Sequence, residues 1–197
     1  MCLARLAFVW TLFVLGWNAP AHARLYVEGG VGQQNYRLSN GTTDFGALDL
    51  GMVFGYAVEV GVNGGPWLVG VRYWSNSKTI TKSDMANTYF QDALYLMGAL
   101  AFGGDVAVEP FAGGGSLVSS RMTLSGTTAD GTYSNSGLTA LGGLRLRARF
   151  ASKSLPIDFV VEGGYRFVYP LSFSSGAYLL GAETSGYYWR TGLRLNL

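Results

Sequence analysis

Four glutamates recur in nearly the same local sequence, and their type and spacing could support chemistry. They are Glu28 in YVEGG, Glu59 in AVEVG, Glu109 in AVEPF and Glu162 in VVEGG. Carboxylates that meet in one place can act as a general acid and a general base. They can equally be neutralised by arginine, whose planar guanidinium group pairs with a carboxylate through two parallel hydrogen bonds.

Arginines accompany these glutamates on one face of the alternating segments described below. With two aspartates added, that face carries six acids and seven arginines. Because buried charges need partners, we expect an interior ion-pair network and not a catalytic centre. Its expected members are Glu28, Glu59, Glu109, Glu162, Asp49, Asp158, Arg72, Arg145, Arg147, Arg149, Arg166, Arg190 and Arg194.

Other catalytic and binding chemistries lack the residues they need. Cys2 and His22 are the one Cys and the one His of the chain, and both fall in a segment that we expect to be removed. Thiolate, disulfide and histidine chemistry are therefore not expected in the mature protein. A metal would find only oxygen ligands, and the acids of the expected loops are too scattered for a dedicated site. We expect no catalytic residue, no metal site and no cofactor.

The first 23 residues have the layout of a secretory signal peptide. Arg5 precedes the apolar run LAFVWTLFVLGW, and Ala21-His22-Ala23 supplies the small residues that come before a cleavage site. The run is short for a membrane-spanning helix, which needs about 20 residues. We therefore expect a cleaved signal peptide over 1–23 and one domain over 24–197. The formal net charge of +2 does not indicate nucleic acid binding.

Eight segments with alternating polarity follow the expected cleavage site. Short connections such as VNGGPW alternate with long polar ones, which include 75–88, 119–137 and 170–185. This layout is typical of outer-membrane barrels with an even number of strands. We predict an all-β fold, an eight-stranded antiparallel up-and-down transmembrane β-barrel with short periplasmic turns and long extracellular loops. The predicted strands are 25–36, 47–61, 67–74, 89–102, 106–118, 138–150, 157–169 and 186–197.

Each segment places bulky apolar residues on one face and glycine, alanine or charge on the other. In FVVEGGYRFVYP, Phe159, Val161 and Tyr165 share a face opposite Glu162 and Arg166. A soluble, lipocalin-like barrel would turn the apolar face inward around a ligand. However, glycines gather on the charged face, where they would make room in a narrow interior, and aromatics gather near segment ends, as in interfacial girdles. We therefore expect the apolar face to meet lipid.

Two motifs resemble small bacterial outer-membrane β-barrels of the opacity and OmpA/OmpX-like type. The terminal RTGLRLNL resembles their assembly signal, with Arg190, Gly192, Leu195 and Leu197 at the matching positions, although that family most often ends in Phe. VEPFAGGGSL looks like their strand rich in Pro, aromatic residues and Gly. The resemblance implies a location in the outer membrane, contact with outer-membrane lipids and recognition by the barrel-assembly machinery.

The expected function is non-enzymatic. We expect a monomeric barrel with a filled interior that acts in envelope integrity and surface interaction, including adhesion to a host or matrix ligand through its loops. The alternative is a narrow channel for small or hydrophobic solutes. An enzyme acting on outer-membrane lipid comes third, because lipid A deacylases and palmitoyltransferases of this architecture depend on a His with a Ser. No His follows residue 23.

Overall fold

The computed structural model describes residues 23–37, 49–82, 85–125, 131–150, 156–169, 171–175, 178–182 and 185–197. Within these residues, no helix is long and apolar enough to cross a membrane. The strands are β1 (Arg24–Arg37), β2 (Asp49–Asn63), β3 (Trp67–Lys82), β4 (Met85–Leu100), β5 (Phe102–Gly103), β6 (Val106–Ser125), β7 (Gly131–Asn135), β8 (Leu138–Arg149), β9 (Ile157–Val168), β10 (Leu171–Ser175), β11 (Tyr178–Ala182) and β12 (Gly186–Asn196).

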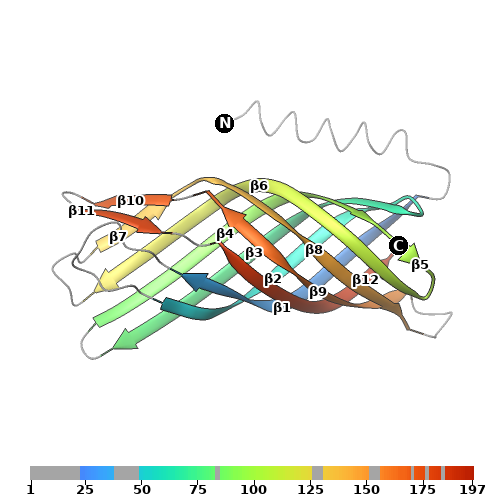
Figure 1. Ribbon diagram of the computed structural model, residues 1–197, viewed down its shortest axis with the longest axis horizontal. Coiled ribbons are helices and arrows are strands. Elements are labelled where there is room, and N and C mark those ends of the chain that lie inside the picture. Colours follow the sequence, from blue (N-terminus) through green and yellow to red (C-terminus); the bar gives the residue numbers. More distant parts are fainter. Residues whose placement is uncertain are drawn as a thin grey trace.

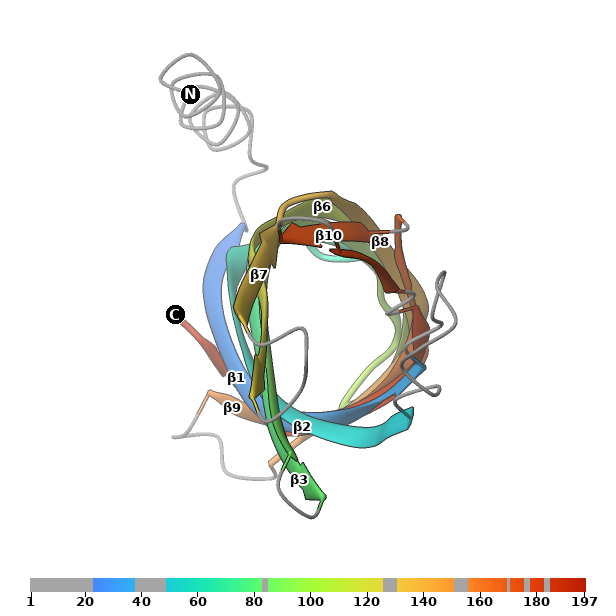
Figure 2. The same cartoon turned by 90° about the vertical axis from the view of Figure 1, so that its left-hand side faces the viewer.

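Eight of these strands close into a single antiparallel barrel, seen from the side in Figure 1 and along its axis in Figure 2. The order around the ring is β1, β2, β3, β4, β6, β8, β9 and β12, and β12 pairs with β1. Neighbours in the ring are neighbours in the sequence apart from short added strands. This confirms the predicted eight-stranded up-and-down barrel.

The connections 64–66 and 104–105 lie at one end of the barrel, where β8 ends and β9 begins and the Phe150 N–H donates to the Ile157 carbonyl at 3.2 Å; we call it the short-turn end. Tight glycine turns form both connections. Gly65 and Gly103 have φ angles of 88° and 125°, which favour glycine. The Asn63 Oδ1 atom accepts a hydrogen bond from the Gly65 N–H at 3.1 Å. This turn fixes the register of β2 against β3 and so places Glu59 opposite Arg72.

Three long polar ranges at the other end, the loop end, were expected to be loops, and for much of their length this was wrong. In 75–88, β3 continues to Lys82 and β4 begins at Met85, with Thr79 paired to Thr88. In 119–137, β6 continues to Ser125 and pairs with β7. In 170–185, β10 pairs with β11. These stretches were expected to be loops because they are polar or rich in Gly and Ser, yet backbone pairing extends the strands through them.

The two faces of the barrel wall have opposite character, and the predicted orientation is confirmed. Phe54 is 66% exposed and Tyr187 is 76% exposed on the outside, whereas Glu59 and Arg72 are 1% and 0% exposed inside. Large apolar side chains, which we call the outer belt, thus cover the outside of the wall, as on a surface that faces lipid. The lipocalin-like alternative, with apolar residues inward and charges in water, is thereby excluded.

Candidate functional site: a luminal ion-pair network

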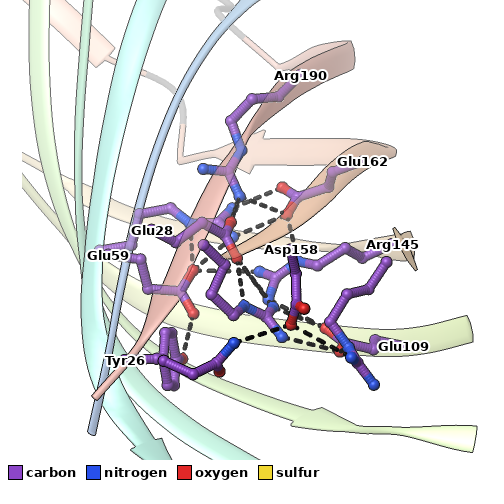
Figure 3. Close-up of polar contacts among 12 residues, drawn as sticks. Tyr26, Glu28, Glu59, Glu109, Arg145, Asp158, Glu162 and Arg190 are labelled. Carbon is purple, nitrogen blue, oxygen red and sulfur yellow. Dashed lines mark hydrogen bonds and ion pairs between the residues drawn. The ribbon is translucent and has the colours of Figure 1, made fainter. Parts of the chain in front are cut away.

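Strand alternation and register bring the inward charges of seven strands close together in the lumen. Glu28 lies opposite Glu59, which lies opposite Arg72, and Arg145 lies between Glu109 and Glu162 on the neighbouring strands. All are buried. Figure 3 shows the four glutamates converging with Arg145. We call the connected set the luminal network; its members are Glu28, Glu59, Glu109, Asp158, Glu162, Arg72, Arg145, Arg147, Arg190 and Arg194.

Two ion pairs of this network cross the full width of the barrel. Arg72 of β3 donates two parallel hydrogen bonds to Glu162 of β9, at 2.6 and 2.8 Å. Arg145 of β8 donates to Glu59 of β2 at 3.1 Å. In each case the two strands are four places apart in either direction around the ring, so each pair follows a diameter. Side chains thus close the lumen at this level.

Arg145 is the centre of the network. Its guanidinium group lies within ion-pair distance of all four glutamates: 2.9 Å from Glu162, 3.1 Å from Glu59, 3.4 Å from Glu109 and 3.5 Å from Glu28. The Phe111 ring packs beneath it, 5.3 Å from the guanidinium carbon. One cation shared by four carboxylates is stable only because other arginines neutralise the same acids.

Further arginines extend the network toward the short-turn end. Arg194 pairs with Glu109 through two hydrogen bonds of 2.9 and 2.8 Å and with Glu28 at 2.9 Å. Arg147 joins Glu109 to Asp158 at 2.9 and 3.2 Å. Every carboxylate of the network therefore touches at least one guanidinium group.

Aromatic and amide side chains fill the lumen on the loop side of the network. The Tyr188 hydroxyl donates to Glu162 at 2.9 Å, and its ring meets that of Trp74 edge to face, with centroids 4.8 Å apart. Arg166 lies at this level, where its Nε donates to the Tyr95 hydroxyl and its Nη1 donates to Gln34 at 3.1 Å. The interior is thus filled beyond the charged layer.

Arg149 does not lie in the lumen as expected. Its side chain is 54% exposed and lies 3.7 Å from Asp105 and 3.5 Å from Asp158. Arg149 is the last residue of β8, so the inward alternation carries it past the end of the barrel wall. Asp49 begins β2, but its side chain lies outside the part of the chain that the structure describes.

Two tyrosines of the site were missed by the sequence analysis. The Tyr26 hydroxyl donates to Glu59 at 2.5 Å, and Tyr188 donates to Glu162 as described above. Each stands two residues before a network charge, Glu28 and Arg190 respectively. The period of two, applied to tyrosine as well as to charge, could have found both.

The four residues of the expected assembly signal divide between the two faces of β12. Arg190 is in the network, Leu195 and Leu197 are exposed, and the Leu197 N–H donates to the Leu25 carbonyl at 2.8 Å. Gly192 lies opposite Gly30 on β1, where a Cβ would come 2.8 Å from the Gly30 Cα atom. These contacts serve barrel closure; the role in assembly remains a prediction.

The network has little chemistry open to a substrate. Its carboxylates are buried and occupied by guanidinium groups, whereas a general acid or base must reach the reacting atoms. Within the described residues, no group of three or more His, Cys, Asp or Glu side chains is arranged to hold a metal ion. The arrangement is suited to closing and bracing the lumen.

The chain was compared with family models, with curated proteins and with solved structures, and only the solved structures match. No family model matches the chain, and no curated protein matches it.

Solved structures match over most of the chain. A major outer membrane protein of Thermus thermophilus has a TM-score of 0.61 at 12% identity, covering 89% of this chain and 100% of that one. Ail, the attachment invasion locus protein of Yersinia pestis, in complex with the heparin analogue sucrose octasulfate, has a TM-score of 0.53 at 13% identity, with 89% and 99% covered. OprG of Pseudomonas aeruginosa gives 0.54 at 10%, with 89% and 96% covered. The chain therefore has the fold of small bacterial outer-membrane β-barrels.

Proposed function

We propose that this protein is an outer-membrane β-barrel without enzymatic activity, which acts in envelope integrity and in surface interaction through the segments at its loop end. The observation that carries this proposal is the pair of ion bridges along two diameters, Arg72 to Glu162 and Arg145 to Glu59. A lumen closed by side chains leaves the outer belt and the loop end as the surfaces that can act on other molecules.

The outer belt supports the membrane location. Aromatic side chains such as Tyr165 and Tyr187, which pack edge to face at 5.0 Å, lie on the lipid side of the wall. The signal-like residues 1–23, a mature domain over 24–197 and recognition of Arg190, Gly192, Leu195 and Leu197 by the assembly machinery belong to the same proposal. So does a monomeric state, because the eight strands of the ring pair with one another and close the barrel wall.

The strands at the loop end support the surface role. β4 pairs with β3 as far as Lys82 and with β6 as far as Ser125, well past the level of the network. Ail, a protein of the same fold, was solved with a heparin analogue. We therefore place a host or matrix ligand, with sulfated glycans as the first class to examine, at the loop end of this chain.

One experiment in two steps tests the proposal. The full chain is produced in a bacterium with an outer membrane, and fractionation together with external protease treatment shows whether it reaches the surface. The same cells are then allowed to bind immobilised matrix proteins and sulfated glycans, with protease-treated cells as the matched control. We expect recovery in the outer membrane and binding that protease treatment removes.

Two results would contradict parts of the proposal. Recovery of a soluble protein without detergent would exclude the membrane location. Surface display with no binding above that of protease-treated cells would exclude the adhesive role and leave envelope integrity, which is measured as detergent and antibiotic sensitivity of cells lacking the protein.

A further inference from the structure

A shallow, widely open hollow of about 530 Å³ lies on the outer wall across β3, β4 and β6, near the short-turn end. It lies on the lipid-facing side of the strands, among the first residues of β3 and the last residues of β4. It is lined by the outward residues Trp67, Val69, Gly98, Leu100, Pro110 and Ala112 and by the inward residues Leu68, Ala99 and Phe111, all of them apolar.

Strand register explains why the wall is hollowed there. Val69, Gly98 and Ala112 form one row across the three strands. Gly98 has no side chain, and a Cβ built on it meets nothing within 4 Å. The next row toward the short-turn end pairs Trp67 with Leu100. Two large side chains thus border a place where the central residue contributes almost no volume.

Pro110 opens the backbone at the same place. Proline has no N–H to donate to a neighbouring strand. Pairing of β4 with β6 stops at Ala99 and Phe111 and resumes with Phe102 and Val108 in β5. In the gap, the Ala101 N–H donates to the Pro66 carbonyl at 2.7 Å. The hollow therefore rests on the missing side chain at Gly98 and on a break in backbone pairing, with Trp67 and Leu100 at its border.

We propose that this hollow binds one hydrocarbon chain of a phospholipid from the leaflet at the short-turn end. The site is continuous with the lipid-facing belt, since Leu100, Val108 and Leu144 are exposed around it. Its lining offers no charged side chain that could hold a headgroup. A flexible chain restores the dispersion contacts that an empty hollow loses. The inference rests on the membrane location proposed above.

Lipid retention tests the site. The barrel is extracted from membranes in mild detergent, and native mass spectrometry measures the fraction that keeps a bound phospholipid. Gly98→Leu fills the hollow. Gly29→Leu is the matched control, because Gly29 is also outward and its Cβ would meet nothing within 4 Å. We expect wild type and Gly29→Leu to keep the phospholipid and Gly98→Leu to lose it.

Folding of each variant is checked by its faster gel migration before boiling, and Ala112→Leu replaces Gly98→Leu if the latter does not fold. Equal retention by Gly98→Leu and Gly29→Leu would overturn the site. Wild-type dimers that Gly98→Leu abolishes would also overturn it, because the occupant would then be a second barrel. A chain that never fractionates with membranes would overturn the location itself, and this shows before any lipid is measured.

Discussion

Glu162 illustrates how a single residue supports the barrel. It accepts hydrogen bonds from Arg72, Arg145, Arg190 and Tyr188 and is fully buried. Removing one partner of a buried ion pair leaves an uncompensated charge and costs about 3–5 kcal/mol. Glu162→Ala should therefore lower the free energy of unfolding by about that amount, as measured by denaturant unfolding of the protein in lipid vesicles.

Asp105→Ala is the control for that experiment. Asp105 is 85% exposed and lies 3.7 Å from the half-exposed Arg149. Exposed ion pairs contribute about 0–1 kcal/mol, so this change should be nearly silent. If Glu162→Ala proved as stable as Asp105→Ala, the luminal network would not stabilise the fold.

The sequence predicts which residues belong to the luminal network better than it predicts which of them pair with one another. The period of two identifies which residues face inward, and it does so for the four glutamates without any knowledge of the fold. Arg72 and Glu162 are 90 residues apart, and their contact depends on strand number and register together. Arg149 shows a limit of this method: alternation predicts which face of a strand a residue lies on, but it does not predict where the barrel wall ends.

Strands of this barrel are specified by two different signals. Within the membrane belt, apolar alternation specifies them, and those strands were predictable. Toward the loop end, ranges such as 75–88 pair through backbone and side-chain hydrogen bonds, for example Thr79 with Thr88 at 3.1 Å. An inward glycine in the sequence predicts that the interior has no space for a side chain at that position, but it does not predict which neighbouring atoms occupy the space. At Gly55, a Cβ would lie 2.5 Å from the Ser75 carbonyl oxygen.

The outer face of β4 provides a test at the level of the strand. Leu96 is 45% exposed within the belt, whereas Thr79 is exposed on β3 near the loop end. A lipid-facing arginine costs about 2–4 kcal/mol at the bilayer midplane and about 0–1 near the interface. Leu96→Arg should therefore reduce the fraction that folds into lipid vesicles, and Thr79→Arg should not. Gel migration before and after boiling measures that fraction; equal folding of both variants would contradict the face assignment.

The whole molecule is a ring whose interior is closed by its own side chains. Eight strands enclose a space just wide enough for side chains to fill. Here two ion bridges cross that space, and Tyr188 and Trp74 pack on their loop side. The network has five carboxylates and five guanidinium groups, so its own charges balance, and Arg166 adds one buried positive charge on its loop side.

We therefore expect the wild-type barrel to show no steady conductance in planar lipid bilayers. Arg72→Ala combined with Glu162→Ala removes both ends of one diameter without changing the net charge, and this double variant should leak. Arg149→Ala, at the exposed end of β8, should remain closed like the wild type. A stable, ion-selective open state of the wild-type protein that is lost on changing Arg145 would contradict the closed lumen, because the same side chains would then line a channel and select its ions.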